Sequence, residues 1–565
     1  MRLVKGNHDN LKRLIKNIFI ILAQGEKKKL LRLALSDILI NMLDLAFLVG
    51  LLYVINFYTQ PFHAATLNIP SLAIFNQYPL LLITVFFLLF SIKNLFGFLL
   101  CKMEYNFVYE VASRISRDNL LRYFGGTYQD YVSVDSSVFN RKISQQPIEF
   151  CHYVLNGMQQ AFSQSVIIVF TIITIIIFNP LLFPLLVVIL APPVFLIAFL
   201  MKRRLDAARL HGKKTSEKTM QHLQEALSAF VESNTYEKKD FFTSRYHRFQ
   251  LQLNHYLSER LVIQSLPPRL IEVFAIFGLL ILVLVNYFAA HDHFLGVGTI
   301  GTFMVAAYKV IPGIVKITNI TGQVKTYAYA TDGLAEFACE PLKNNYPPDP
   351  VCSIVFEKVS FSYPGKNIIN AFSLNVRKGD MVAITGISGR GKTTFVNLLL
   401  GFLTPTSGSI YINGSLADTN SRQGYWSRIG YIKQQPFFLH ASIMENITLH
   451  DCHYDEVKIR KIMTLTGIDK WIDSFPNGLK TVITENGKNF SGGQRQRIIF
   501  ARALYKDFDL LILDEPFHEL DESSEMDMLG QLQKMSAEGK IILLITHNKA
   551  ALRFCNKKIL MDASG

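Results

Sequence analysis

The sequence predicts a bundle of six membrane-spanning α-helices followed by an α/β domain of the P-loop NTPase type. Apolar residues make up 50% of the 565 residues and concentrate at residues 33–320. The remainder alternates short apolar strands with helical segments around a glycine-rich loop, a pattern typical of α/β domains. A single hydrophobic core rarely exceeds ~250–300 residues, so a chain of this length contains at least two domains.

The charge and the cysteines fit a membrane protein with a cytosolic portion. The net charge is +14, but the excess Lys and Arg lie mainly between the apolar segments of the N-terminal part. Because nucleic-acid binding needs a clustered basic face, we expect no nucleic-acid partner. The six cysteines are scattered without CxxC spacing, as is typical of reduced thiols.

The N-terminus carries an amphipathic pattern. Residues 11–22 alternate Lys and Arg with Leu, Ile and Phe at helical spacing, which predicts a helix lying in the membrane interface. A solvated basic tail is the alternative. Because Lys27, Lys28 and Lys29 follow this stretch in place of a cleavage site, we expect no removable signal peptide.

Six segments are long and apolar enough to cross a bilayer. A helix needs ~20 apolar residues to span the hydrocarbon core and satisfies its backbone polar groups internally. Buried helices of soluble proteins are shorter and more amphipathic, which argues against that alternative. We expect the spans at residues 33–58, 79–100, 161–178, 181–201, 271–290 and 297–317.

Basic residues predict the orientation of this bundle. Lys and Arg are dense at residues 102–142 and 202–269 and absent from 59–78, 179–180 and 291–296. Since basic loops stay in the cytoplasm, we expect an integral, multi-pass protein of a bacterial inner (plasma) membrane, with its N-terminus and its C-terminal α/β domain in the cytoplasm. The two long cytoplasmic segments are expected to extend the membrane helices.

A few polar residues lie inside the expected spans, where they are costly in lipid. Asp37, Asn41 and Asp44 share one helical face, and Lys93 lies at a comparable depth if the first two spans run antiparallel. We expect an ion pair between Lys93 and one of the aspartates, as a structural contact or as part of a translocation path. Lys309 is a candidate for lining a substrate cavity, with a structural role as the alternative.

A stretch rich in Pro and Asn at residues 341–350 interrupts the helical pattern and can sustain neither helix nor strand. It predicts the boundary between two domains. We expect a transmembrane domain at residues 1–340, a linker at 341–352 and an α/β domain at 353–565.

A phosphate-binding loop follows the first buried strand of the α/β domain. The strand at residues 381–385 leads into GxxxxGK followed by Thr, at the start of a helix. Glycines let backbone N–H groups and the helix N-terminus point at phosphate oxygens. Lys392 adds a positive charge for the β- and γ-phosphates, and the Thr393 hydroxyl can bind Mg²⁺. We expect ATP to contact Gly386, Ser388, Gly389, Arg390, Gly391, Lys392, Thr393 and Thr394.

A second apolar strand, residues 510–513, ends in two acids, Asp514 and Glu515. A carboxylate at the tip of a parallel sheet beside a phosphate loop is where a Mg²⁺ ligand belongs, and Asp514 fits that role. Glu515, one residue further, is expected to orient and polarise the attacking water as a general base. A solvent-exposed acidic turn would not explain the four aliphatic residues before it.

The segment from Phe490 to Gln494 reads FSGGQ. With it the chain resembles the ATP-binding cassette (ABC) transporter family, whose hallmark LSGGQ it matches with Phe in place of Leu. A helix N-terminus again presents donors to phosphate. The resemblance implies that a γ-phosphate bound by the opposite subunit of a head-to-tail dimer contacts Ser491, Gly492, Gly493 and Gln494.

The resemblance also implies roles for residues outside these motifs. Tyr363 is expected to stack on adenine. Gln434 is expected to touch Mg²⁺ and water, and His547 to hold the γ-phosphate, both as catalytic residues beside Glu515. Glu485 resembles an acid that contacts the membrane-domain loops.

Asp521 resembles the loop Asp that crosses the dimer. The four residues ending at Asp521 read HELD here, where the family commonly has SALD, and this departure affects the detail of the cross-dimer contact. Residues 144–148 and 233–237 look like coupling helices that seat on the ATPase domain, with ordinary loop helices as the alternative.

Six helices ahead of one ATPase domain are similar to type I ABC exporters. The resemblance implies a half-transporter that works with ATP and Mg²⁺ as a homodimer, with a heterodimer as the alternative. It implies an ATPase, a translocase that exports an amphipathic small molecule, a lipid or a modified peptide. An exporter-shaped importer of a metal chelate such as a siderophore is the alternative. A soluble ATPase of DNA repair or translation conflicts with six spans.

Overall fold

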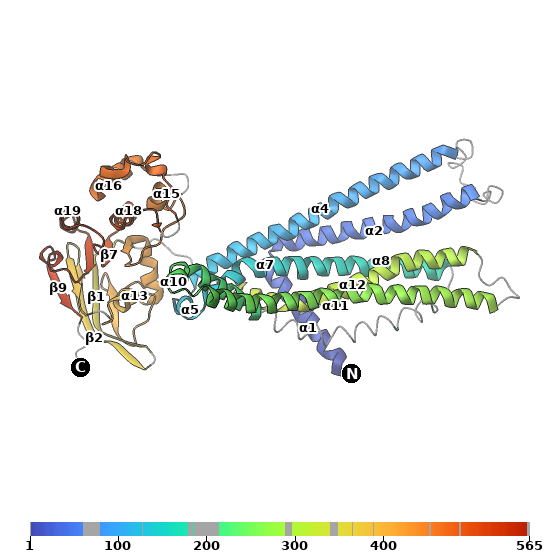
Figure 1. The fold of residues 1–565 in the computed structure, drawn as a ribbon, viewed down its shortest axis with the longest axis horizontal. Helices are drawn as coiled ribbons and strands as arrows, with labels where there is room; N and C mark the ends of the chain where they lie inside the picture. Colours follow the sequence, from blue (N-terminus) through green and yellow to red (C-terminus); the bar gives the residue numbers. More distant parts are fainter. Residues whose placement is uncertain are drawn as a thin grey trace. The chain divides into compact units, whose positions relative to one another are not determined.

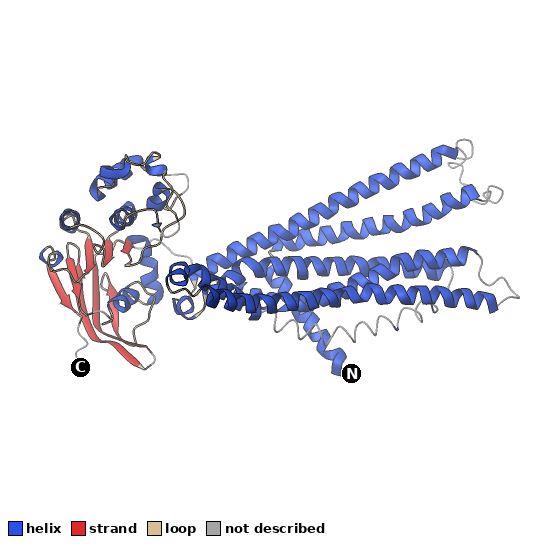
Figure 2. Ribbon diagram, in the orientation of Figure 1, coloured by secondary structure: helices blue, strands red, loops and turns tan. Residues whose placement is uncertain are grey.

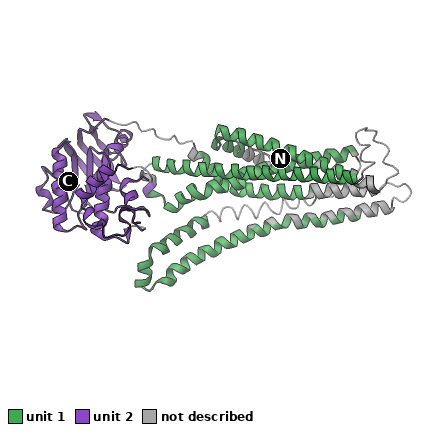
Figure 3. Cartoon of the chain, turned by 90° about the horizontal axis from the view of Figure 1, so that it is seen from above, with its two compact units in different colours: residues 1–126, 133–342 green, residues 127–132, 343–565 purple. Residues whose placement is uncertain are grey.

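The chain forms two compact units in the computed structural model (Figure 3). Unit 1 comprises residues 1–126 and 133–342, and unit 2 comprises residues 127–132 and 343–565. Unit 1 is helical, whereas unit 2 combines strands with helices (Figure 2). The structure describes residues 2–59, 79–126, 128–178, 184, 192, 214–288, 297–338, 349–363, 365–387, 389–450, 454–484 and 487–561.

Unit 1 consists of long helices with short helical segments between them (Figure 1). Its long helices are α1 (Arg2–Ile21), α2 (Gln24–Thr59), α4 (Pro79–Gly125), α8 (Asn156–Phe178), α11 (Lys239–Phe288) and α12 (Val297–Ala338). Its short segments are α6 (Ser136–Asn140), η3 (Arg141–Gln145), α7 (Gln146–Glu149), η4 (Phe150–Leu155) and α10 (Phe230–Thr235).

Within the described residues, three helical segments are long and apolar enough to cross a membrane. They are Gln24–Leu51, Leu80–Gly125 and Ser136–Ile177, and they contain the first three predicted spans over most of their length. The predicted span at residues 181–201 lies outside the described part of the chain. The last two predicted spans, 271–290 and 297–317, fall almost entirely within α11 and α12.

The N-terminal helix α1 packs its apolar side into unit 1. Leu14, Ile18 and Ile21 are buried there with residues of α4, η4 and α12. On the polar side, the Asn17 side-chain amide donates to Asp332 of α12 over 2.8 Å. The predicted helix at residues 11–22 is therefore present, and its apolar stripe contacts protein.

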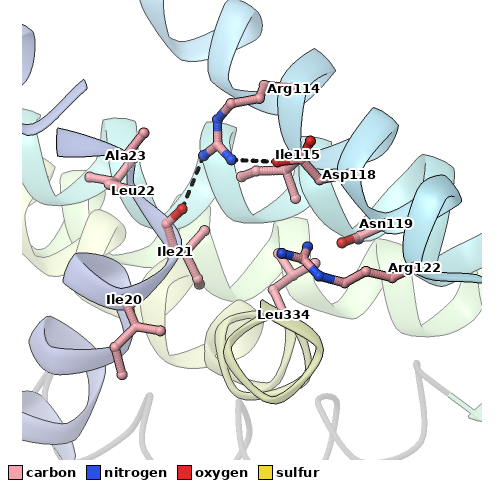
Figure 4. Close-up of a pocket in the computed structure, with 10 residues that line it drawn as sticks. All are labelled: Ile20, Ile21, Leu22, Ala23, Arg114, Ile115, Asp118, Asn119, Arg122 and Leu334. Carbon is pink, nitrogen blue, oxygen red and sulfur yellow. Dashed lines mark hydrogen bonds and ion pairs between the residues drawn. The ribbon is translucent and has the colours of Figure 1, made fainter. Parts of the chain in front are cut away.

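Arg114 of α4 fixes the junction between α1 and α2. Its guanidinium donates to both carboxylate oxygens of Glu26, at 2.6 and 2.9 Å, and to the backbone carbonyl of Ile21 at 3.0 Å. A further bond of 2.8 Å reaches Asp118. Figure 4 shows the guanidinium between the Ile21 carbonyl and Asp118, beside a small cavity. The angle between the two helices thus depends on one side chain that satisfies several acceptors.

The predicted ion pair between the first two spans is confirmed. The Lys93 ammonium of α4 contacts the Asp44 carboxylate of α2, and the Lys93 side chain is only 7% exposed. Nearby, the buried Asn41 amide donates to Ser163 of α8 over 2.7 Å. Both contacts satisfy polar groups in segments that are otherwise apolar, where an unpaired group is costly.

Helices α8 and α12 approach each other closely at glycines. A Cβ atom at Gly313 of α12 would lie 3.1 Å from the Ile168 side chain of α8, and one at Gly157 of α8 would lie 3.3 Å from Ile320 of α12. The backbone of α11 continues through Pro267 and Pro268. The side chain of Lys309, on α12, lies outside the described residues.

The position of the first predicted coupling helix is corrected by the structure. We expected a coupling helix at residues 144–148, but these residues belong to unit 1, where Gln146 and Pro147 are buried. The short helix α5 (Tyr128–Ser133) instead belongs largely to unit 2, where the Tyr128 ring lies 5.0 Å from the Phe402 ring. Its hydroxyl accepts a bond from the Asn397 amide at 3.4 Å. The prediction at 233–237 overlaps α10 and stays a prediction.

Unit 2 is built on two sheets (Figures 1 and 2). The antiparallel sheet has the order β2-β1-β4-β5 and the parallel sheet the order β6-β7-β8-β3-β9. Two buried clusters of apolar residues include side chains of the parallel sheet, in which every residue of β7 and β8 is buried. The strands are β1 (Ser353–Tyr363), β2 (Lys366–Arg377), β3 (Met381–Thr385), β4 (Ser407–Ile412), β5 (Ser415–Leu416), β6 (Ile429–Ile432), β7 (Leu510–Asp514), β8 (Ile541–Ile545) and β9 (Lys557–Leu560).

Helices surround these sheets. Those that position the site are α13 (Lys392–Leu399), α18 (Gly492–Tyr505) and α19 (Glu522–Ala537). The others are α14 (Thr419–Gly424), η5 (Tyr425–Arg428), α15 (Ile443–Thr448), α16 (Glu456–Thr466), α17 (Asp469–Ile472), η6 (Gly478–Lys480) and η8 (Ala551–Arg553). The predicted linker at 341–352 falls largely on residues outside the described part, so its boundaries stay a proposal.

The Lys93–Asp44 pair can be tested by Lys93→Met. The substitution leaves the Asp44 carboxylate without a counter-ion, which typically costs about 3 kcal/mol or more for a buried pair. We expect a lower melting temperature of the purified protein in detergent, and Lys93→Met/Asp44→Leu should recover most of the loss. Lys102→Met, at an exposed position of the same helix, is the control. Equal melting temperatures for Lys93→Met and Lys102→Met would show that the pair does not stabilise the bundle.

Candidate functional site

The predicted site residues gather at one edge of the parallel sheet in unit 2. In a parallel sheet all strands end at the same edge, which is where ligands bind in open α/β folds. The phosphate loop follows β3, Asp514 ends β7, Thr546 and His547 follow β8, and Gln434 lies two residues after β6. Because β7, β8 and β3 are neighbours in the sheet, their terminal residues meet in space.

The glycine-rich loop has the backbone that the motif predicts. Gly389 and Gly391 adopt positive φ angles of 81° and 90°, a conformation that residues with a Cβ atom rarely adopt. A Cβ atom at Gly391 would also lie 2.9 Å from the Ile368 side chain. The loop therefore requires glycine for conformation and for space. Arg390 is exposed, and Ser388 lies outside the described residues.

Helix α13 begins at Lys392, directly after this loop. The Lys392 side chain is buried, and its ammonium donates to the Gly386 carbonyl at 2.8 Å. The same nitrogen lies 2.5 Å from Nε2 of His547. Thr393 is exposed in the first turn, whereas Thr394 is buried. The loop and helix N-terminus thus present a lysine and backbone donors, the arrangement that binds phosphate.

Two acids end the neighbouring strand β7. Asp514 is 6% exposed. Burial raises the pKa of Asp514, and the charge of Glu515 raises it further, whereas Lys392 and Lys433 act in the opposite direction. A divalent cation beside Asp514 would favour its charged form. Glu515 has a φ angle of 49°, unusual for a residue with a side chain, and its backbone N–H donates to the Ile545 carbonyl at 3.0 Å.

Glu515 connects two of the other predicted catalytic residues. The Gln434 amide donates to one carboxylate oxygen of Glu515 over 2.9 Å. Nε2 of His547 lies 3.5 Å from the other oxygen and within hydrogen-bond distance of Lys392. Lys392, Glu515, Gln434 and His547, with Asp514 beside them, therefore form one connected cluster. We call these five residues the catalytic cluster.

The FSGGQ segment forms the N-terminus of helix α18. Ser491 caps the helix: the Gln494 backbone N–H donates to its hydroxyl, and the Ser491 backbone N–H donates to the side-chain oxygen of Gln494 at 3.0 Å. A Cβ atom at Gly492 would lie 2.7 Å from the Glu519 carboxylate, and one at Gly493 would lie 3.3 Å from the Glu519 carbonyl. Both glycines are therefore needed for the close approach of the chain around Glu519.

Phe490 replaces the leucine of the family hallmark for a reason that the structure makes plain. Its side chain is 5% exposed and stacks on the Phe475 ring at 5.2 Å, with Trp471 at 6.2 Å. An aromatic residue at this position fills a pocket between aromatic rings. Phe in place of Leu therefore changes the packing behind the segment that begins at Ser491, and Ser491 itself stays exposed.

The structure does not bring all the predicted residues together. Among the described residues, no hydrogen bond or ion pair joins Ser491 or Gln494 to the catalytic cluster. Asp521 caps helix α19 and accepts bonds from Ser523 and Ser524, which hold its pKa well below the usual range. Tyr363 ends β1 and is 43% exposed. Glu485 lies outside the described part of the chain.

One positioning residue escaped the sequence analysis. Arg502 of α18 donates to the carbonyls of Phe437 and Asn446, at 2.7 and 2.6 Å, and so ties the segment after Gln434 to the helix that begins at Gly492. Burial lowers the pKa of Arg502 to about 10. In the sequence, Arg502 looks like any other basic residue of an amphipathic helix. Only its burial distinguishes it from the exposed basic residues.

The comparisons with known proteins agree with this geometry. Residues 369–518 match the ABC transporter family model. The mitochondrial potassium channel ATP-binding subunit of Rattus norvegicus is 35% identical over 277 residues, which are 47% of this chain and 38% of that protein. The ATP-dependent lipid A-core flippase of Ralstonia nicotianae is 26% identical over 387 residues, 67% of this chain and 65% of that protein. The chain thus spans less than two thirds of either relative.

A solved structure matches the whole architecture. The structure of a bacterial Atm1-family ABC exporter with ATP bound superposes with a TM-score of 0.76 at 16% identity, covering 94% of each chain. At this identity the likeness concerns the fold, and it confirms the predicted fold class. Residues 369–518 thus carry an ABC transporter domain, and the chain as a whole has the fold of an ABC exporter, in which a helical bundle and one α/β P-loop unit share a single chain.

Proposed function

We propose that this chain is one half of an ATP-driven exporter, whose two copies bind and hydrolyse ATP to move cargo across a membrane. One observation carries the proposal: the catalytic cluster lies at the sheet edge beside a glycine loop that only glycines can form. A buried lysine, a buried carboxylate and an exposed helix N-terminus fit a nucleoside triphosphate. The match of residues 369–518 to the ABC transporter family model supports ATP binding by this unit.

The chain's own residues divide the chemistry between them. Lys392 and the loop N–H groups would hold the phosphates. Glu515, aligned by Gln434, would accept a proton from the attacking water, and His547 would stabilise the γ-phosphate. Mg²⁺, when bound by Asp514, Thr393 and Gln434, would neutralise charge on the phosphate oxygens.

The separation of Ser491 from the catalytic cluster supports a dimer. Ser491 is exposed at the N-terminus of a 14-residue helix, a position suited to bind an anion that the same chain does not supply. A second copy placed head to tail would bring its own γ-phosphate to this helix. Because every site residue we predict is present in the chain, a homodimer suffices, and a heterodimer is the alternative.

The cargo that we propose is an amphipathic small molecule, a lipid or a modified peptide. The exporter fold and the likeness to a protein named as a lipid A-core flippase support this class. In the proposed cycle, ATP binding joins two copies of unit 2, and the membrane helices change which side of the bilayer they expose. The ligand acts through its preference for the closed state.

The role of Glu515 can be tested by Glu515→Gln. The substitution keeps the shape of the side chain and removes the base, so we expect ATP turnover to fall by about 10²- to 10⁴-fold while ATP affinity changes little. Turnover is measured by phosphate release in nanodiscs, and affinity with a fluorescent ATP analogue. Glu538→Gln, at an exposed position of the same unit, is the control and should behave as wild type. Normal turnover in Glu515→Gln would remove Glu515 from the base role.

The direction of transport can be tested with membrane vesicles. If the ATPase unit is cytoplasmic and the protein exports, inside-out vesicles supplied with ATP should accumulate fluorescent lipid analogues, lipopeptides or amphipathic dyes. Vesicles that contain Glu515→Gln should not accumulate them. ATP-dependent accumulation of a ferric siderophore only in right-side-out vesicles loaded with ATP would instead establish the importer.

A further inference from the structure

A polar cavity of about 280 Å³ lies inside unit 1, among helices α2, α4, α8 and α12. Each helix contributes polar side chains to its lining. At ~30 Å³ for each water-sized group, the cavity has room for roughly ten non-hydrogen atoms. The lining includes Asp37, Glu104, Gln159, Gln160, Gln164 and Lys316.

The charge of this lining is unbalanced. Among the described residues of the lining, two carboxylates, Asp37 and Glu104, share the cavity with one basic residue, Lys316, which is exposed. Within the described residues, no ion pair or hydrogen bond occupies the Asp37 carboxylate. This differs from the neighbouring polar groups, since Asp44 is paired with Lys93 and Asn41 with Ser163. Ionisable side chains in a membrane bundle are costly, so two acids that share one lysine call for a functional explanation.

Gln159 supplies an independent observation that points to a ligand. Its side chain is 7% exposed and lines the cavity. Its amide nitrogen donates to Glu104 over 2.6 Å, but its carbonyl oxygen is buried and accepts no hydrogen bond. A buried acceptor without a donor costs about 1 to 3 kcal/mol, so a ligand that donates to it is favoured.

These groups together match the chemistry of an ammonium. A primary ammonium has three N–H donors and no acceptor. The cavity offers the Asp37 carboxylate, the Glu104 oxygen that does not bind Gln159, and the free carbonyl oxygen of Gln159. Tyr105, which also lines the cavity, could add an aromatic face. An anion would meet two acids and an unpaired carbonyl oxygen and is disfavoured.

The position of the cavity suits the head group of an amphiphile. Its residues lie at one end of the expected spans: Asp37 near the start of the first, Glu104 just after the second, and Lys316 at the end of the last. This end is cytoplasmic in the proposed orientation. Charged head groups of molecules dissolved in a leaflet lie at the same depth, where water meets hydrocarbon.

We infer that this cavity binds the primary ammonium group of a cationic amphipathic molecule, through Asp37, Glu104 and Gln159. The inference names a cargo class for the proposed transporter and, as a statement about cargo, rests on that proposal. Lys316 faces the same cavity and competes with the ligand as an internal cation. Removing Lys316 should therefore strengthen binding, whereas removing either acid should weaken it.

Binding can be measured with dansylcadaverine, a fluorescent amphipathic primary amine. The full-length protein is placed in nanodiscs of zwitterionic lipid without nucleotide, and the signal of empty nanodiscs is subtracted. We expect saturable binding to wild type. N-acetyl-dansylcadaverine, which lacks the charge, should bind at least tenfold more weakly.

Substitutions of the lining residues test whether the amine binds in this cavity. Glu104→Gln and Asp37→Asn should each weaken dansylcadaverine binding by about tenfold, as expected for loss of one charge-assisted bond. Lys316→Met should tighten binding several-fold, a gain that misfolding cannot produce. Glu110→Gln, on the same helix but exposed and paired with Lys29 at 2.8 Å, is the control and should leave binding unchanged.

The outcomes separate this inference from the proposed function. Equal affinities of wild type, Glu104→Gln and Lys316→Met for dansylcadaverine would overturn the inference, as would equal binding of the acetylated probe. Stimulation of wild-type ATP turnover by dansylcadaverine that is lost in Glu104→Gln would identify the bound amine as cargo. If wild type binds the amine but hydrolyses no ATP, the transport proposal fails while the ammonium site stands.

Discussion

The alignment of three neighbouring strands is the constraint on which the site depends. Ile545 of β8 lies opposite Ile384 of β3 on one side and opposite Asp514 of β7 on the other. This register brings the glycine loop, the acid pair and His547 to the same level of the sheet edge. A one-residue slip of β7 or β8 would move the acid pair or His547 away from the loop and turn its side chains to the other face, so the catalytic geometry depends on this register.

Much of this arrangement could be predicted from the sequence, because it depends on local order. The loop, the strand that ends at Asp514, and the cap at Ser491 are contiguous motifs whose residue types allow few alternatives. The Lys93–Asp44 pair was predictable because helical spacing and depth in the bilayer together place the two residues. The proximity of Glu515 to Gln434 and His547 followed from family resemblance and could not be derived from spacing alone.

Contacts between distant segments were not predictable. The helix that packs on unit 2 was placed too late in the chain, because residues 144–148 and the helix at Tyr128 look alike as short polar helical segments. Their difference is the ring contact between Tyr128 and Phe402, which are far apart in sequence. Arg502 escaped notice for the same reason, since its acceptors on Phe437 and Asn446 come from another part of the fold.

The polar side chains of unit 1 fall into two groups. Lys93, Asp44, Asn41 and Ser163 satisfy one another, as structural polar contacts between helices do. The cavity that contains Asp37 and Glu104 is lined by two carboxylates and one lysine among the described residues. Helix association alone explains the first group, because each of its members has a partner. It does not explain the second.

The 50-residue helix α11 has a mechanical consequence that follows from its two prolines. A helix of that length extends ~75 Å, against a hydrocarbon thickness of ~30 Å, so a bilayer core that it crosses upright would contain less than half of it. Pro267 and Pro268 have no N–H, which leaves the carbonyls of Ile263 and Gln264 without their usual partners four residues on. This weak point comes just before the predicted span at 271–290. The missing hydrogen bonds make this the place where α11 bends most easily, directly before its predicted entry into the bilayer.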